Sequence, residues 1–253
     1  MASLSAVVIS KNEERNIRRC LESVSFADEL ILIDSQSTDN TRAIAAEMGA
    51  KIYSPEWKGF GPAKQYGVER ASHNWVLSVD ADEVVSTELK VEILSVIKAD
   101  NEFAGYYVPR CTNFNGRWIR HSGWYPDYVL RLFDKTKGGF NAAYVHEKVE
   151  VTGPTGQLKN DLLHYSYPTL EDYFDKFNYY TTVGAEELFK KGKKTSWVKI
   201  MVKPLAQFVK QFILKAGFLD GGEGFLISFL SAVAVMVKYA KLRALNKTTK
   251  ASE

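Results

Sequence analysis

The 253-residue sequence has only two cysteines, Cys20 and Cys111, and neither belongs to a CxxC pair. Two cysteines are too few for a disulfide framework, and their spacing excludes a zinc or redox motif of that kind. We therefore expect a reducing, cytosolic compartment. A short apolar run opens the sequence, but a charged segment at residues 11–15 follows it without a cleavage site of small residues. No secretory signal peptide is predicted.

The sequence also lacks internal repeats and low-complexity tracts. Hydrophobic residues make up 45% of the chain and charged residues 25%, values that are ordinary for a globular domain. This composition excludes a disordered, collagen-like or disulfide-scaffold protein. The length is that of one large domain, with or without an appendage.

The net charge of +3 conceals an asymmetry between the two parts of the chain. Residues 190–253 contain 13 Lys and Arg against 3 Asp and Glu, which leaves a net charge of −7 for residues 1–189. An acidic first part argues against nucleic acid as a partner. A basic second part interleaved with apolar residues indicates an anionic surface as its partner.

The first hundred residues alternate short β-branched runs with segments of helical periodicity, which is typical of βαβ units. The predicted parallel strands cover residues 4–9, 29–34, 51–53 and 75–79. The predicted helices cover residues 16–24, 62–71 and 87–99, and another ends near Gly49. Strand-like runs between residues 105 and 167 predict the rest of a mixed sheet. A helix is predicted at residues 169–191, so the domain is expected to end near Gly192.

Acidic side chains follow three of the four predicted strands. They are Glu13 and Glu14 after the first strand, Asp34 and Asp39 at the second, and Asp80, Asp82 and Glu83 after the fourth. Each one alone is equally well explained as a turn or helix cap. Ligands of an open parallel sheet, however, bind beyond the carboxyl ends of its strands. Carboxylates this close repel one another unless a cation lies among them, and hard oxygen ligands suit Mg²⁺ or Mn²⁺.

Three longer segments carry a resemblance to a known family. They read AVVISKNEERNIRRCLESV, ILIDSQSTDNT and WVLSVDADE. Over residues 4–100 they resemble the inverting nucleotide-sugar glycosyltransferases of family 2. Shorter motifs farther along, RLF, HEKV, LLHYSY and GFLDGGEGF, resemble the branch that contains bacterial lipopolysaccharide core β-1,4-glucosyltransferases. The resemblance implies an α/β fold of the GT-A (Rossmann-like) type, a mixed sheet flanked by helices, which binds a nucleotide diphosphate sugar, usually UDP-linked, and a divalent metal.

The resemblance implies a nucleotide site at the ends of the first two strands. Glu13 or Glu14 would contact the uridine, and Asp34 would accept hydrogen bonds from the nucleoside. The residues implied to shape the same pocket are Ser35, Ser37 and Asp39. Lys64 lies where the family often has a basic residue directed at uracil or diphosphate, and a surface lysine is the alternative.

A metal and diphosphate site is implied at the end of the fourth strand. Asp80 and Asp82 match the DXD-type motif, with Asp82 in direct metal contact and Asp80 on the ribose or the metal. His164 would join the metal or diphosphate shell, and a core histidine is the alternative. Arg131 and Lys176 would neutralise charge that builds on the leaving group, and surface salt bridges are the alternative for both.

An inverting transfer also needs a carboxylate that takes the proton from the attacking hydroxyl. The usual Glu-Asp base motif of the family is absent from the sequence. Two candidates are present, Asp127 in YPDYVLRLF and Glu147 in VHEKV, where His146 precedes it. We favour Glu147 as the base, with His146 beside it in the catalytic site and Asp127 as the alternative.

The last sixty residues have an amphipathic pattern of their own. On a helical wheel one side is basic, with Lys199, Lys203 and Lys210, and the other is apolar, with Trp197, Met201, Leu205, Phe208 and Phe212. Pro204 predicts a kink or the start of a second segment. Residues 224–237 are apolar but shorter than the ~20 residues that span a bilayer. We predict helices that lie on an anionic membrane or re-enter it, with packing on the domain or a dimer interface as the alternative.

Residues 1–191 are therefore predicted to form the catalytic domain, with a nucleotide-sugar half at 1–100 and an acceptor half at 101–191. Residues 192–253 are predicted to be a membrane-associating C-terminal helical appendage. The predicted activity is a metal-dependent hexosyl transfer, from UDP-glucose to lipopolysaccharide inner-core heptose, by a peripheral enzyme on the cytoplasmic face of a bacterial inner membrane.

Three alternatives differ from this activity. The acceptor of a transferase can instead be a polyprenyl phosphate or another lipid-linked glycan. A nucleotidyltransferase would need a Gly-rich loop after the first strand, where KNEERN has none. A membrane-bound scaffold with a decayed sugar-nucleotide site is the non-enzyme alternative, and the intact Asp34, Asp80 and Asp82 argue against it.

Overall fold

The computed structural model describes residues 3–99, 102–141 and 147–251. The chain forms two compact units. The first comprises Met1–Cys111 and Asp127–His164, and the second comprises Thr112–Pro126 and Tyr165–Glu253. This division places the helix at residues 170–190 with the C-terminal helices, whereas the sequence predicts a boundary near Gly192. The assignment of functions to the two sides of that boundary stays a prediction.

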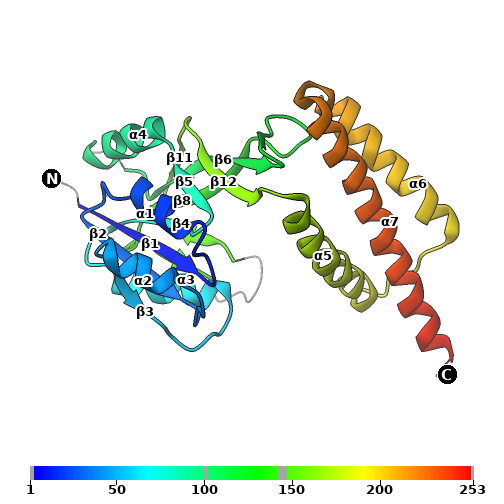
Figure 1. Cartoon of the computed structure of the whole chain (residues 1–253), viewed down its shortest axis with the longest axis horizontal. Coiled ribbons are helices and arrows are strands. Elements are labelled where there is room, and N and C mark those ends of the chain that lie inside the picture. Colours follow the sequence, from blue (N-terminus) through cyan, green and yellow to red (C-terminus); the bar gives the residue numbers. More distant parts are fainter. Residues whose placement is uncertain (1–2, 100–101, 142–146, 252–253) are drawn as a thin grey trace. The chain divides into compact units, whose positions relative to one another are not determined.

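Four parallel strands form one side of the sheet in the first unit (Figure 1). They are β1 (Leu4–Ser10), β2 (Glu29–Asp34), β3 (Lys51–Tyr53) and β4 (Trp75–Asp80), in the spatial order β3-β2-β1-β4. β1, β2 and β4 are short runs of mostly apolar, often β-branched residues, as expected for strands that are buried on both faces, whereas β3 is a short, partly exposed edge strand. The predicted four parallel strands are all present.

Strands of mixed direction complete the sheet beyond β4. They are, in spatial order, β8 (Asp127–Asp134), β6 (Gly105–Phe114), β12 (Leu162–Tyr167) and β5 (Glu83–Val85). β8 is antiparallel to both β4 and β6, and β5 is antiparallel to β12. β11 (Thr155–Gln157) pairs with β6 in parallel and β7 (Arg117–Trp118) pairs with it antiparallel. A separate ribbon pairs β9 (Gly138–Phe140) with β10 (Val149–Val151). The ends of β6 and β12 continue into the second unit. The sheet is therefore mixed, as the sequence predicts.

Helices cover both faces of the parallel strands. One face is covered by α1 (Ile17–Ser23), α2 (Thr41–Glu47) and α4 (Thr87–Lys98). The other face is covered by α3 (Phe60–Arg70). In β1 the side chains alternate, so that Leu4 and Val8 enter the first core and Val7 enters the second. Gly67 lets α3 approach the sheet closely, because a Cβ there would lie 2.4 Å from Val7 Cγ1.

The second unit consists mainly of helices. They are α5 (Leu170–Lys190), α6 (Trp197–Phe208), the π-helical turn η1 (Val209–Leu214), the 3₁₀ turn η2 (Gly217–Asp220) and α7 (Gly221–Ala251). Thr169 and Asp172 form a capping box at the start of α5. α6 continues through Pro204 and changes to π-helical geometry only from Val209.

α7 packs along both α5 and α6 (Figure 1). The Lys241 ammonium donates to the Asn178 carbonyl and side-chain oxygen and to the hydroxyls of Thr181 and Thr182, at 2.7–3.2 Å. A small core of Phe114, Ile119, Tyr173, Ile227 and Leu230 lies in the same unit. These contacts explain why α5 belongs with the C-terminal helices.

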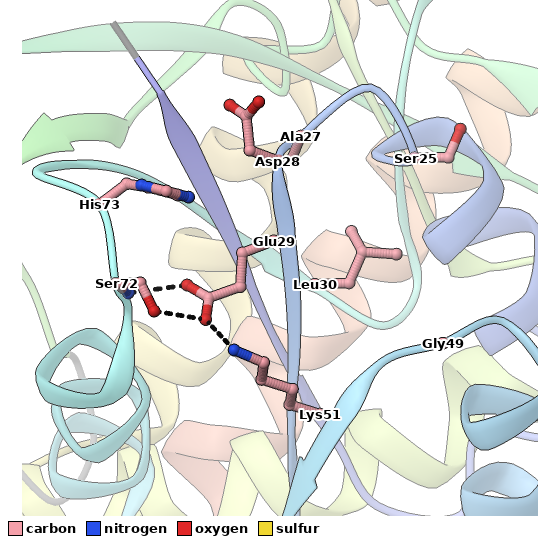
Figure 2. A pocket seen from close by; sticks show the side chains of 9 residues that line it. All are labelled: Ser25, Ala27, Asp28, Glu29, Leu30, Gly49, Lys51, Ser72 and His73. Atoms are coloured by element: carbon pink, nitrogen blue, oxygen red, sulfur yellow. Dashed lines mark hydrogen bonds and ion pairs between the residues drawn. The ribbon is translucent and has the colours of Figure 1, made fainter.

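A polar pocket of about 380 Å³ lies at the amino end of β2, opposite the end that carries Asp34 (Figure 2). Its central group is Glu29, which is 7% exposed. The Glu29 carboxylate accepts hydrogen bonds from Lys51 Nζ, from the hydroxyl of Ser5, and from the amide and hydroxyl of Ser72, at 2.6–2.8 Å. The pocket is therefore built around a satisfied internal carboxylate that joins β1, β2, β3 and the end of α3.

We expect Glu29→Gln to destabilise the protein in a pH-dependent way. Burial acts to raise the pKa of the Glu29 carboxyl, but the hydrogen bonds from Lys51, Ser5 and Ser72 outweigh it and lower the pKa from 4.5 to about 2. The stabilisation is complete above pH 4.5 and is lost as the pH falls toward 2. At neutral pH the variant should lose about 2–3 kcal/mol of unfolding free energy.

Urea unfolding from neutral to acid pH measures this difference. Glu22→Gln, at an exposed position of α1, is the matched control and should change little. A gap between wild type and Glu29→Gln that persists undiminished below pH 3 would contradict the assignment.

Candidate functional site

The carboxyl ends of β1, β2 and β4 bring the predicted acidic residues to one edge of the sheet. The strand order β3-β2-β1-β4 changes direction between β1 and β4, and such a switch point is where open α/β sheets bind ligands. The register sets Asp34 opposite Ser10 on one side of β1 and Asp80 opposite Ile9 on the other. Asp34 and Asp80 therefore flank the end of the same strand.

Asp34 organises the loop after β2. Its side chain is wholly buried and accepts hydrogen bonds from the hydroxyls of Ser10 and Ser37, at 3.2 and 2.5 Å, and from the Ser37 amide at 3.0 Å. Asn12, which has a φ of 56°, links the loop after β1 to this turn. Its backbone amide donates to Ser37 Oγ, and its side-chain Oδ1 accepts from the Thr38 backbone amide. In this conformation Asp34 shapes the loop, and its contact with a nucleoside stays a prediction.

The other acidic residues of the predicted nucleotide site lie in the same two loops. The Glu13 amide donates to Thr41 Oγ1 at 2.8 Å, and the Glu14 amide donates to Asp39 Oδ2 at 3.1 Å. Burial acts to raise the pKa of the Asp39 carboxyl, but hydrogen bonds from Thr41 and from the Glu14 amide lower it below its usual value. The Ser35 amide donates to the Ser10 carbonyl. The predicted pocket residues are thus brought together in one interlocked pair of loops.

Lys64 joins Asp80, a predicted metal and nucleotide-sugar ligand, to Glu147, the favoured base. Its ammonium lies 2.9 Å from Asp80 Oδ1 and 2.7 Å from Glu147 Oε1, and its side chain is 4% exposed. Of the two alternatives for Lys64, the structure therefore excludes the surface lysine. Its position on α3, which packs against the opposite face of the sheet from α1, places a cation at the end of β4.

Arg131, on β8, holds the other oxygen of Asp80. Its guanidinium lies 2.5 Å from Asp80 Oδ2 and 2.6 Å from Glu83 Oε1. Burial acts to raise the pKa of the Asp80 carboxyl, but Arg131 and Lys64 lower it far below its usual range. Burial acts in the opposite sense on Arg131, and Asp80 and Glu83 raise the pKa of its guanidinium above the ordinary value. Asp80 is therefore a partly buried carboxylate, 24% exposed, held between two cations.

Glu83 and Arg110 extend this cluster of charges. Glu83 is wholly buried, and it accepts from the Asp80 amide at 2.9 Å and from Arg110 Nη1 at 3.3 Å. Arg110, on β6, also donates two hydrogen bonds to Asp127, at 3.0 and 2.6 Å. Sequence reasoning missed Arg110, because a lone arginine in a strand gives no local signal. Only the pairing of β6 with β8, which sets Arg110 opposite Asp127, reveals its role.

Asp82 and His164 form a separate pair. His164 Nε2 lies 3.3 Å from Asp82 Oδ2, because β12 pairs with β5 and sets His164 opposite Glu83. His164 Nδ1 is buried and has no hydrogen-bond partner among the residues that the structure describes. Within those same residues no group of three or more His, Cys, Asp and Glu side chains has the arrangement of a metal site.

The two base candidates have different surroundings. Glu147 pairs with Lys64 and is 16% exposed, whereas Asp127 pairs with Arg110 and is 44% exposed.

His146, the third predicted catalytic residue, lies outside the described residues. Lys176 belongs to the second unit, where it donates to the carbonyl and hydroxyl of Ser166, and its role toward diphosphate stays a prediction. The site thus brings together Lys64, Asp80, Arg131 and Glu147. Asp82 lies two residues after Asp80, and the pairing of β12 with β5 brings His164 to Asp82.

Several known proteins are similar to this chain. An uncharacterized glycosyltransferase of Rickettsia typhi is 30% identical over 97% of this chain and 88% of the relative. A lipopolysaccharide core biosynthesis glycosyltransferase, LpsC, of Rhizobium meliloti is 28% identical over 94% of this chain and 93% of the relative. A crystal structure of glucosyl-3-phosphoglycerate synthase from Mycobacterium tuberculosis with Mn²⁺, UDP and glucosyl-3-phosphoglycerate covers 44% of each chain at 27% identity, with a TM-score of 0.37.

A family model agrees with the fold and the acidic motifs. The model described as Glycosyl transferase family 2 matches residues 5–158, a segment that includes the four parallel strands, both loops of the predicted nucleotide site and the carboxylates Asp80, Asp82 and Glu147. The predicted GT-A mixed sheet flanked by helices, with a C-terminal helical appendage, is confirmed. The chain therefore belongs to glycosyltransferase family 2.

Proposed function

We propose that the protein transfers glucose from UDP-glucose, with inversion, to an inner-core heptose of lipopolysaccharide at the cytoplasmic face of a bacterial inner membrane. The observation that carries the transferase part is the meeting of Lys64, Asp80, Arg131 and Glu147 at the switch point of the sheet. The similarity to the lipopolysaccharide core glycosyltransferase of Rhizobium meliloti supports the choice of acceptor.

The donor would bind across the ends of β1, β2 and β4. The interlocked loops after β1 and β2 offer carboxylates and hydroxyls for the nucleoside, and Lys64 and Arg131 offer positive charge for the diphosphate. Both cations now neutralise Asp80 and its neighbours. A bound diphosphate would share them, and such preorganised cations stabilise the charge that grows on the leaving group.

Asp82 and His164 fit a divalent cation. A carboxylate oxygen and an imidazole nitrogen 3.3 Å apart, both on partly exposed side chains, can face a single ion. Mg²⁺ and Mn²⁺ accept such a small protein ligand set when water and phosphate oxygens supply the rest. When bound, the ion would add positive charge to the diphosphate as a Lewis acid. Asp80 would become a ligand only if it gave up an ion pair with Lys64 or Arg131.

The transfer itself is a single displacement. The oxygen of the acceptor hydroxyl forms a bond to the anomeric carbon, the bond from that carbon to the diphosphate oxygen breaks, and the hydroxyl proton passes to Glu147. Lys64 positions the Glu147 carboxylate at the site through their 2.7 Å contact. Nucleoside diphosphate is the product that leaves.

The test of the function is a panel of nucleotide sugars incubated with the purified full-length protein and Mn²⁺. We expect release of UDP from UDP-glucose, increased by a heptose-containing core oligosaccharide. Stimulation by a polyprenyl phosphate instead would assign the protein to the lipid-linked glycan class. Absence of nucleotide release with every donor would contradict a transferase and leave the sugar-nucleotide scaffold.

Metal dependence is a separate prediction. We expect the affinity for UDP, measured by calorimetry, to fall at least about ten-fold when Mn²⁺ is removed, because diphosphate and acidic side chains repel without a bridging cation. Asp82→Asn should cause a similar loss in the presence of Mn²⁺. Asp134→Asn is the matched control, because Asp134 lies opposite Trp75 at the start of β4, whereas the acidic residues of the site follow the end of that strand. Equal affinity with and without the metal would refute the prediction.

A further inference from the structure

The α6–α7 hairpin carries a continuous exposed apolar surface. We call it the apolar face, and it consists of Val198, Met201, Val202, Leu205, Val209, Ile213, Leu214, Phe218, Leu219, Phe225 and Phe229, each at least 42% exposed. On α6 and η1 these residues recur every three or four positions, so they form one stripe. Phe208 and Phe212 join this stripe to α7 through ring contacts with Phe225 at 5.7 Å.

The charges around the apolar face identify its partner. From Lys193 to Lys247 the sequence has ten Lys and Arg but only two acidic residues, Asp220 and Glu223. Asp220 is 2% exposed and serves as an internal acceptor. Lys199, Lys203 and Lys210 are exposed on the same helices. Helices that combine exposed apolar area with exposed positive charge match a bilayer with anionic headgroups.

The corner between α6 and α7 is tied to a polar loop. The Asp220 carboxylate accepts hydrogen bonds from the amides of Arg120 and His121, at 3.1 and 2.9 Å, and contacts His121 Nδ1 at 3.0 Å. The Ser122 amide donates to the Lys215 carbonyl at 2.9 Å. All of these residues lie in the second unit. If the corner crossed a bilayer, it would carry this loop and its arginine through the hydrocarbon, where charged side chains are costly.

The length of the apolar run in α7 also argues against a helix that crosses the membrane. The segment Gly217–Thr248 is long and apolar enough to cross a membrane by length and composition. Its uncharged part, however, covers only residues 224–237, which is about 21 Å of helix against a hydrocarbon core of about 30 Å. Lys241 lies within the remainder and is bound to α5 by four hydrogen-bonding contacts.

We propose that α6, η1, η2 and α7 lie flat on one leaflet of an anionic bilayer through the apolar face, and that α7 does not span the membrane. This deepens the proposed function, on which it rests for the lipid-linked acceptor. Both helices of the hairpin contact the same leaflet, so the corner and the carboxyl end of α7 stay on the side of the catalytic unit.

Co-sedimentation of the full-length protein with phosphatidylethanolamine–phosphatidylglycerol vesicles tests the surface. Leu205→Glu and Leu214→Glu, which alter residues 66% and 74% exposed, should each weaken binding at least about ten-fold. Val91→Glu alters a residue 64% exposed on α4 in the first unit, and it should bind as wild type does. Unchanged binding of both leucine variants, or their conversion of a stable dimer to a monomer without loss of vesicle binding, would overturn the proposal.

Thiol labelling tests the orientation, since the native Cys20 and Cys111 are buried. Gly222→Cys and Lys247→Cys add exposed thiols near the two ends of α7, and a Cβ at Gly222 meets no atom within 4 Å. We expect a membrane-impermeant maleimide to label both variants in inverted membrane vesicles and neither in sealed right-side-out vesicles. Labelling of the two positions from opposite sides would show that α7 spans. UDP release in detergent is measured in parallel, so that its absence in the wild type counts against the proposed function and not against this surface.

Discussion

Glu147→Gln is expected to lower the turnover number about 10²-fold or more while the affinity for the donor barely changes. Glutamine keeps the shape of the side chain and a carbonyl oxygen near Lys64, but it has no basic lone pair for the proton of the acceptor hydroxyl. Lys64 keeps its second partner, Asp80, at 2.9 Å, so the substitution leaves no unpaired buried cation. Turnover with saturating acceptor and calorimetric UDP affinity, measured on the same preparation, separate the two effects.

Asp127→Asn is the matched control for Glu147→Gln. The Asp127 carboxylate accepts two hydrogen bonds from Arg110 and is 44% exposed, so we expect a smaller loss that comes from the position of Arg110. If Asp127→Asn abolishes transfer and Glu147→Gln retains most of it, the two roles must be exchanged. If both variants keep full activity, neither carboxylate is the base.

The parallel half of the fold could be predicted almost residue by residue. The strand prediction of 29–34 agrees with β2, and that of 75–79 stops one residue short of β4. Strands buried on both faces are short runs of apolar residues with polar residues at their ends, which makes their limits visible in the sequence. The same feature located Asp80 and Asp82, because the acidic triplet directly follows the last apolar residue of β4.

The partners of these carboxylates could not be predicted in the same way. Arg110, Arg131 and His164 come from β6, β8 and β12, and their positions depend on antiparallel register that no local pattern encodes. The close contact of Lys64 with Glu147 joins residues 83 positions apart. The grouping of α5 with α7 depends on hydrogen bonds of Lys241 to Asn178, Thr181 and Thr182, and a lysine near the end of a basic segment is read from the sequence as a surface charge.

Arg131→Met should destabilise the protein by about 3–5 kcal/mol at neutral pH, the cost of leaving buried charge without its partner. The Arg131 side chain is 6% exposed and contacts Asp80 and the wholly buried Glu83. Methionine fills part of the volume but leaves Glu83 with Arg110 alone, at 3.3 Å, and Asp80 with Lys64 alone. Chemical unfolding monitored by circular dichroism measures the loss, and Arg131→Lys, which retains a cation, should lose less.

The pH dependence distinguishes an electrostatic cause from a packing defect. In the wild type, Arg131 and Lys64 hold the pKa of Asp80 far below its usual range in spite of burial, so this stabilisation is present above the pKa of the unfolded state and is lost in acid. Without Arg131 the pKa of Asp80 rises toward its ordinary value. Acidification therefore lowers the unfolding free energy of the variant less than that of the wild type. The stability gap should therefore be largest near neutral pH and should narrow below about pH 4.

A second substitution identifies the partner that carries the penalty. Adding Glu83→Gln to Arg131→Met removes the buried carboxylate that has lost its closest cation, so the double variant should be more stable than the sum of the single changes predicts. Neighbours that share an ion pair give coupling energies of about 0.5–3 kcal/mol in such cycles. Two results together would contradict this account: strictly additive effects of the two substitutions, and a stability gap that is constant from neutral pH to acid. They would mean that Arg131 stabilises the site through packing alone, and that the pKa of Asp80 does not depend on the charge of Arg131.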